Sequence, residues 1–258
     1  MSNLRRLALL VAVVAFVVLM VSGIAHAEPD PDPFAIPTLT SIKPAANPQE
    51  GVQSIQLLMM LTVLSVAPAI LILTTAFTRI VVVMGFLRTA IGTQQLPPNQ
   101  VLLGLALFLT FAVMAPTFKQ VNAAALQPYM RGELTQQQAF DAAAKPMKEF
   151  MLPQTFEKDL ALMIEITDAP SPETPEDIPF MTLVPAFAIS ELKRAFTMGF
   201  VIFLPFVIID FITASTMMSM GMMMVPPTLI SMPFKILLFV LVDGWHLVVK
   251  SLFQSFQV

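Results

Sequence analysis

The chain has 258 residues, of which 56% are hydrophobic and only 12% are charged, and its net charge is −3. An ordinary soluble domain is about half apolar and about a quarter charged, so this composition excludes a disordered chain and a typical cytosolic enzyme. The absence of cysteine excludes a disulfide framework and a thiolate metal site, and the acidic balance excludes a nucleic-acid binder. We expect an all-α membrane protein, with about four long apolar helices in two hairpins and a small helical insert.

Residues 1–27 have the organisation of a secretory signal peptide. Two arginines precede an uncharged apolar run, and small residues flank His26 at its end. This order predicts cleavage after Ala27, while an uncleaved signal anchor is the alternative. The next segment, 28–51, is rich in proline and has no periodicity, which predicts an extended tether outside the cytoplasm.

Residues 52–118 predict the first apolar hairpin. The run 52–78 is uncharged and long enough to cross a membrane, and 101–118 is a second uncharged apolar run. Arg79 and Arg88 lie between the two runs, followed by a polar turn. The positive-inside rule therefore places this connection in the cytoplasm, in agreement with a translocated N-terminus.

Residues 119–182 differ in composition, with 5 basic and 10 acidic residues and hence a net charge of −5. Thr135 and Gln138 match a capping box, which predicts the start of a helix. Apolar residues at helical spacing over 156–164 predict a second, amphipathic helix. An acidic, proline-rich loop follows at 168–179. We interpret the whole segment as a small helical insert on the non-cytoplasmic, periplasmic side.

Residues 183–258 predict the second apolar hairpin, with a methionine-rich turn. The run 195–225 carries one charge, Asp210, and would be about 46 Å long as a helix, beyond a hydrocarbon core of about 30 Å. The last run is 228–249. The turn between the runs has no Lys or Arg, which contradicts the positive-inside rule. We therefore expect this hairpin to be buried in protein rather than in lipid.

Enzyme chemistry is not expected. Outside the signal the chain has one histidine, and no hydrolase, zinc-protease or phosphate-loop motif is present. Ser190 near Lys193 has the composition of a Ser–Lys dyad, but a helix entry is the better interpretation. We predict no cofactor and no metal.

Ionisable residues within apolar runs are the first candidate functional group, because they usually face a protein interior or a water path. Glu191 and Arg194 can pair on one helix face, whereas Lys235 and Asp243 are about 12 Å apart along a helix and need partners from other helices or other chains. Inter-subunit pairing, surface charges at the membrane boundary and a proton or ion relay are the three interpretations. The candidates are Glu191, Lys193, Arg194, Asp210, Lys235, Asp243 and His246.

The second candidate group is the segment 217–224, in which six of eight residues are methionine. Methionine is unbranched and adaptable, so a ring of such side chains can close a pore or fit around a passing chain. The alternative is that methionine simply fills an apolar helix. Gly221 and the prolines that follow predict a break in the helix here.

Several long motifs resemble the FliP family of flagellar export-gate proteins, over about residues 52–256. The motifs are VPAFAISELKRAFTMGF at 184–200, LPFVIIDF at 204–211, MPFKILLFVLVDGW at 232–245, TRIVVVMGFLR at 78–88 and QQLPPNQ at 94–100.

The resemblance implies a core channel subunit of the flagellar type III export gate, in the bacterial inner membrane at the flagellar basal body. It implies a homo-oligomer of five copies that assembles with FliQ and FliR, works with FlhB and FlhA, and passes unfolded flagellar subunits. It also implies a pore gasket and a surrounding gate loop. The gasket residues are Met222, Met223 and Met224, and the loop residues are Met217, Met218, Met220 and Gly221.

Three alternatives stay open. Injectisome homologues of the SctR type share these motifs but generally lack a cleaved signal, so residues 1–27 favour the flagellar branch. A small-solute transporter or ion channel would use Asp210 and Lys235. A purely structural scaffold of the basal body would need no methionine gasket.

Overall fold

The computed structural model describes residues 58–59, 61–62, 65–66, 68–93, 96–167, 172, 174, 177–222 and 225–256. The chain divides into two compact units, Met1–Leu61 and Thr62–Val258, and the elements below belong to the second. Several predictions lie outside the described residues: the signal peptide with Ala27, the tether 28–51, Met223, Met224 and most of the loop 168–179.

Every regular element in the described part of the chain is a helix, which confirms the all-α prediction. After a short helix, Pro68–Thr74, the helices are α3 (Phe77–Ile91), α4 (Asn99–Val121), the π-helical turn η2 (Asn122–Leu126), α5 (Gln127–Met130), α6 (Gln136–Met151), the 3₁₀ turn η3 (Leu152–Gln154), α7 (Glu157–Ile166), α8 (Phe180–Ser219), α9 (Pro227–Leu241) and α10 (Gly244–Gln254).

Two stretches of the described chain are long and apolar enough to cross a membrane as single helices, the continuous run Asn99–Met130 and α8. Two further pairs meet the same requirement as bent units. Pro68–Thr74 and α3 meet at an angle of 80°, and α9 and α10 meet at 63°. The described chain therefore has two to four candidate spans, in line with the expected apolar helices, and much of the first expected run, 52–67, lies outside the described residues.

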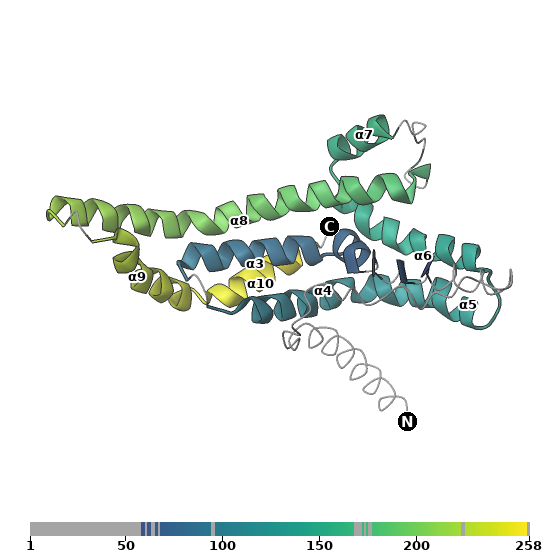
Figure 1. Cartoon of the computed structure of the whole chain (residues 1–258), viewed down its shortest axis with the longest axis horizontal. Coiled ribbons are helices and arrows are strands. Elements are labelled where there is room, and N and C mark those ends of the chain that lie inside the picture. Colours follow the sequence, from purple (N-terminus) through teal and green to yellow (C-terminus); the bar gives the residue numbers. More distant parts are fainter. Residues whose placement is uncertain are drawn as a thin grey trace, which may run out of the picture. The chain divides into compact units, whose positions relative to one another are not determined.

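Helix α3 packs against both α8 and α4, and α10 lies beside it in Figure 1. Its buried side chains Ile80, Val83 and Leu87 recur at helical spacing and belong to the same buried cluster as Leu102 and Ala106 of α4. Full burial of one such large aliphatic side chain contributes about 1.5–3 kcal/mol, so this face holds the apolar helices together.

Gly199 of α8 lies directly against the Phe86 ring of α3. A Cβ atom built on Gly199 would lie 2.5 Å from ring atoms of Phe86. The Phe86 ring also packs edge-on against Phe196, with 5.4 Å between ring centroids. The missing side chain of Gly199 is therefore what lets α3 approach α8.

The polar turn follows Arg88, as the sequence predicted, but the first helix does not end before the two arginines. Arg79 and Arg88 belong to α3, which ends at Gly92 with a left-handed φ of 86°. Arg88 donates a hydrogen bond to Asn99 and so links α3 to the start of α4. The arginines do not end the helix, because Arg79 finds buried acceptors and Arg88 is satisfied at the turn.

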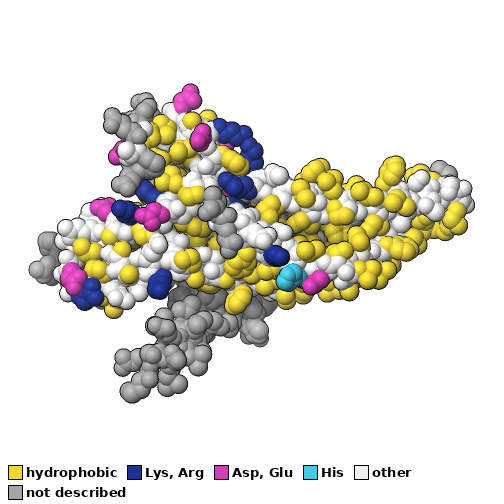
Figure 2. All heavy atoms as spheres, turned by 180° about the vertical axis from the view of Figure 1, so that it is seen from behind, with side chains coloured by type: hydrophobic (Ala, Val, Ile, Leu, Met, Phe, Trp, Pro, Cys, Tyr) yellow, Lys and Arg dark blue, Asp and Glu magenta, His cyan; other side chains and the backbone are white. Residues whose placement is uncertain are grey.

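The charged residues also led to a predicted start of the insert that is too early in the chain. The helical run Asn99–Met130 continues through Lys119, where the insert was expected to begin. Lys119 is exposed, so its charge is compatible with a continuing helix. On the face shown in Figure 2, charged side chains gather over the insert helices, whereas hydrophobic side chains cover the α8–α9 hairpin.

Both predicted helices of the insert are present. At the start of α6, the Gln138 N–H donates to Thr135 Oγ1 and the Thr135 N–H donates to Gln138 Oε1 at 2.9 Å, which completes the capping box. Helix α7 packs on α8, where the Ser190 hydroxyl donates to Asp159 at 2.8 Å and accepts from the Phe156 N–H at 3.0 Å. Ser190 is thus inside α8 and anchors α7, and the helix entry predicted there is wrong.

The second hairpin is formed by α8, α9 and α10 (Figure 1). Helix α8 has 40 residues, so it is about 60 Å long. The predicted single helix 228–249 is broken at Asp243, which has a left-handed φ of 51°. Asp tolerates this conformation better than most residues. A Cβ on Gly244 would lie 2.1 Å from the Phe239 ring, so the bend also needs glycine at that position.

Candidate functional site

The methionine-rich turn ends α8 with a Schellman motif. Gly221 has a φ of 76°, and its N–H donates to the Met218 carbonyl at 3.1 Å. The Met222 N–H donates to the Met217 carbonyl at 3.0 Å. Both bonds satisfy carbonyls that the helix end leaves open. Pro227 then occupies the first turn of α9, as expected for a helix start. The break predicted at Gly221 is confirmed.

The methionines of this turn differ in exposure. Met217 is buried at 6% exposure, whereas Met218, Met220 and Met222 are 66%, 68% and 43% exposed. Of the three predicted gasket residues, only Met222 belongs to the described part of the chain. The tip of the hairpin therefore presents adaptable apolar side chains, which is typical of a surface that contacts variable partners.

One ion pair holds α9 against α8. Lys235 Nζ donates to Asp210 Oδ2 at 2.6 Å, and Ser231 Oγ donates to Asp210 Oδ1 at 2.6 Å. The Lys235 side chain is only 6% exposed and the Asp210 side chain 34%. Lys235 also lies beside Gly92, where the negative end of the α3 dipole favours a cation.

This pair forms within a single chain. The sequence required the partner of Lys235 to come from another helix or another chain, and the structure supplies one from another helix. An inter-subunit contact of Asp210 or Lys235, or a role of either residue in an ion relay, stays a prediction.

A second, fully buried ion pair joins segments that are far apart in sequence. Arg79 Nε donates to Glu191 Oε2 at 2.9 Å and Nη2 donates to Glu191 Oε1, with both side chains at 0% exposure. The remaining donors reach the carbonyl and hydroxyl of Ser255 at 2.8 and 2.9 Å and Gln154 Oε1 at 2.9 Å. The guanidinium also lies 3.8 Å from the centroid of the Phe256 ring.

All five N–H donors of Arg79 are therefore used. The network ties α3 to α8, to η3 and to the segment after α10. Because a buried charge is costly unless every donor is paired, this arrangement indicates a structural centre.

Sequence reasoning missed Arg79 and assigned Glu191 to the wrong partner. Arg194 does not bind Glu191, since its guanidinium lies 4.6 Å from the centroid of the Phe156 ring. Lys193 lies over the same ring at 4.9 Å. The positive-inside rule assigned Arg79 to the cytoplasmic connection between two apolar runs. Its place within the motif at 78–88 was the one signal that set it apart.

The other charged candidates lie apart from these pairs. Asp243 and His246 are exposed near the α9–α10 bend. Neither forms an ion pair among the described residues. Inter-subunit pairing therefore stays a prediction for Asp243, Lys193 and Arg194.

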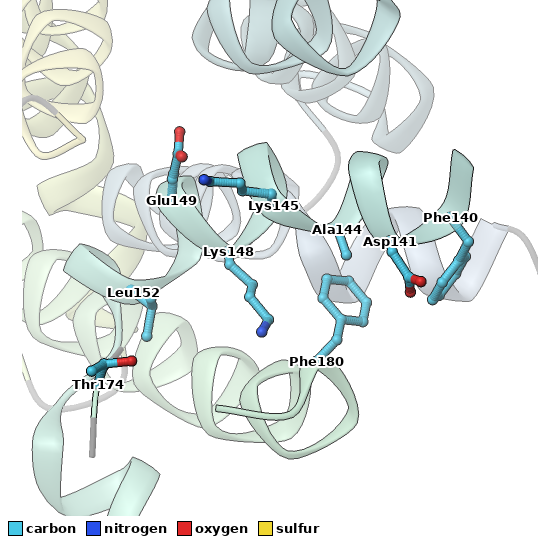
Figure 3. Close-up of a pocket in the computed structure, with 9 residues that line it drawn as sticks. All are labelled: Phe140, Asp141, Ala144, Lys145, Lys148, Glu149, Leu152, Thr174 and Phe180. Carbon is cyan, nitrogen blue, oxygen red and sulfur yellow. The ribbon is translucent and has the colours of Figure 1, made fainter. Parts of the chain in front are cut away.

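A pocket of about 720 Å³ lies between α6 and the start of α8 (Figure 3). Its wall combines apolar side chains with charges of both signs, from Phe140, Asp141, Ala144, Lys145, Lys148, Glu149, Leu152, Thr174 and Phe180. Within the described ranges, no three His, Cys, Asp or Glu residues are close enough to hold a metal ion. The lining alone does not indicate a particular ligand.

Comparison with known proteins gives a consistent result. The model of the FliP family matches residues 60–252. The chain is 58% identical to the flagellar biosynthetic protein FliP of Bacillus subtilis (strain 168) over 212 residues, which is 82% of this chain and 96% of that protein. It is 55% identical to the protein of the same name from Caulobacter vibrioides, over 79% of this chain and 76% of that protein. The corresponding protein of Aquifex aeolicus is 50% identical, over 80% of this chain and 87% of that protein.

Proposed function

The chain belongs to the FliP family, and from this membership we propose that it is a core subunit of the flagellar type III protein export gate. The observation that carries the proposal is the match over residues 60–252, together with coverage of nearly the whole Bacillus subtilis protein. The proposed location is the bacterial inner membrane at the flagellar basal body.

We further propose that several copies of this chain, five by family resemblance, assemble with FliQ and FliR around a central channel. FlhB and FlhA are the expected neighbours. The apolar surface of α8 supports such an assembly, because only 17% of its most apolar window is buried within the chain. An apolar helix surface that is not covered by its own chain needs lipid or another protein against it.

In this proposal the methionine turn closes the channel. Met222, Met223 and Met224 form the gasket, and the exposed Met218 and Met220 surround it. Adaptable side chains seal against ions and small molecules and yield around an unfolded polypeptide. The Asp210–Lys235 pair keeps α9 fixed to α8, so that movement is confined to the tip. Energy comes from other parts of the export system.

Deletion of the gene tests the proposal directly. Motility and the release of hook and filament subunits into the medium should both be lost, and a plasmid copy should restore them. Loss of a different secretion system with normal motility would identify an injectisome subunit instead. Normal motility and secretion would contradict the proposal, and solute-dependent flux through the chain alone would then identify a transporter.

Replacement of Met222, Met223 and Met224 by alanine tests the gasket. We expect increased leakage of ions and small molecules through the assembled complex, because alanine leaves the channel open. M130A/M181A is the matched control, since both methionines are exposed in the insert region, at 77% and 78%. If the complex with all three alanine substitutions shows no increased leakage, the structural-scaffold alternative is favoured.

A further inference from the structure

A group of basic side chains lies where α7 packs on α8, away from the methionine turn and hydrogen-bonded to neither ion pair. We call Lys158, Lys193 and Arg194 the basic patch. Lys193 and Arg194 both lie over the ring of Phe156, at 4.9 and 4.6 Å from its centroid. The ammonium groups of Lys158 and Lys193 are close enough to interact with one another. Two cations thus lie over one aromatic ring, and a third lies close to Lys193.

Nearby carboxylates only partly offset the charge of the basic patch: Asp159 attracts Lys193 and Glu191 attracts Arg194, both at longer range than an ion pair. Among the described residues, none of its three members forms an ion pair. The flanking carboxylates are used elsewhere: Asp159 is 8% exposed and accepts a hydrogen bond from Ser190, and Glu191 binds Arg79. Glu157 is exposed on α7 and leaves the local charge positive.

Arg194 carries a buried donor without an acceptor. Its Nε atom is buried and has no hydrogen-bond partner. Its Nη2 atom makes only a long bond of 3.5 Å, to the carbonyl of Pro153. A buried donor of a charged group that is left unsatisfied costs free energy, so its presence points to an acceptor that is supplied from outside the chain.

An apolar surface adjoins the basic patch. From residue 195 to residue 209, α8 carries no charge. Leu192, Phe196 and Phe200 are four residues apart, share one face of α8 and are 40%, 55% and 64% exposed. Figure 2 shows Lys and Arg side chains where the hydrophobic surface of the α8–α9 hairpin begins. Cations at the end of an exposed apolar stripe match a ligand with an anionic head and an apolar body.

We propose that the basic patch binds the phosphate of an anionic phospholipid, whose acyl chains lie along Leu192, Phe196 and Phe200. A guanidinium pairs with phosphate oxygens in a fork, and the two ammonium groups add positive charge. A carboxylate of a neighbouring subunit would also pair with the cations of the basic patch. Such a contact would not explain why the exposed apolar side chains of α8 begin next to these cations. This inference needs no export substrate. It assigns only the 192–200 face of α8 to lipid and leaves the remaining apolar surface of α8 to the neighbouring subunits of the proposed assembly.

The test is native mass spectrometry of the full-length protein, purified in detergent in the complex that it forms. Phosphatidylglycerol, phosphatidylcholine and inorganic phosphate are titrated separately. We expect preferential binding of phosphatidylglycerol. Since a basic residue near a membrane surface contributes about fivefold to the affinity for anionic lipid, K158Q/K193Q/R194Q should bind it on the order of 100-fold more weakly.

Two further variants make the result specific. K119Q/R131Q/K145Q removes the same charge elsewhere and should bind phosphatidylglycerol like the unmodified protein, and K158R/K193R/R194K keeps the charge and should retain binding. Equal phosphatidylglycerol binding by K158Q/K193Q/R194Q would overturn the proposal. So would binding of inorganic phosphate without preference for the lipid. Loss of subunits from the complex with unchanged lipid per chain would instead assign the patch to a neighbouring subunit's carboxylate.

Discussion

At the scale of single residues, Arg79 shows how a cation can be buried between packed apolar helices. Its five donors all have acceptors, and the flat faces of the guanidinium are covered in part by Phe256. Removing two charges from water is expensive, and their attraction offsets this only when the remaining donors are also bonded. The network therefore fixes the positions of α3, α8 and the segment after α10 relative to one another.

Replacement of Glu191 by glutamine should destabilise the protein by about 3–5 kcal/mol, because the Arg79 cation stays buried without its counter-charge. Unfolding of the purified protein in detergent, followed by temperature or denaturant, measures the change. E149Q is the control, since Glu149 is exposed on α6. A stability of E191Q within about 0.5 kcal/mol of the control would show that the pair contributes little.

The Asp210–Lys235 pair differs, because its carboxylate is partly open to the surroundings. Partial exposure lowers both the cost of burying the charges and the strength of their attraction. Ser231 supplies the second donor. We interpret this pair as the contact that sets the register of α9 on α8.

At the scale of elements, the α3–α8 contact depends on a close approach at Gly199. The Phe86 ring fills the space that any larger side chain at residue 199 would occupy. Packed interiors have few voids, so an added methyl group forces side chains or backbone to move.

Gly199→Ala should therefore destabilise the protein by about 1–3 kcal/mol despite the higher helix propensity of alanine. Thermal unfolding in detergent measures the effect. Adding F86L to the Gly199→Ala variant replaces the ring by a smaller side chain and should restore part of the lost stability. Gly85→Ala is the matched control, because a Cβ there meets no atom within 4 Å. It should be neutral or slightly stabilising. Equal behaviour of the two alanine variants would mean that α3 and α8 can separate without cost.

At the scale of the whole molecule, charge placement and helix length give the expected topology. The α3–α4 turn is predicted to face the cytoplasm and the insert to face the other side, since an odd number of crossings separates them. The bend angles do not alter this expectation, because a bent pair can still connect the two sides.

The absence of native cysteine makes this topology testable without background labelling. Single variants Q137C, in α6, and L96C, in the α3–α4 turn, both place the thiol at an exposed position. A membrane-impermeant maleimide added to intact cells should label Q137C and spare L96C. Permeabilised cells serve as the control, in which both should react. Labelling of L96C but not Q137C in intact cells would reverse the proposed orientation.

The sequence by itself determined the features that depend on neighbouring residues. The all-α membrane class follows from composition, the start of α6 from the Thr135–Gln138 capping box, and the break after α8 from Gly221 and the prolines. Each of these signals acts over a few residues, so it can be interpreted without knowledge of the fold.

Only the tertiary structure decided which charges meet and where apolar runs bend. Arg79 and Glu191 are 112 positions apart, and Asp210 and Lys235 are 25 apart. No periodicity links such positions, because their partners are chosen by the packing of α3, α8 and α9. The bend at Asp243 was also not predicted, although Asp243 and Gly244 form a dipeptide that is common in turns. The run turns where the backbone of Gly244 must pass the Phe239 ring.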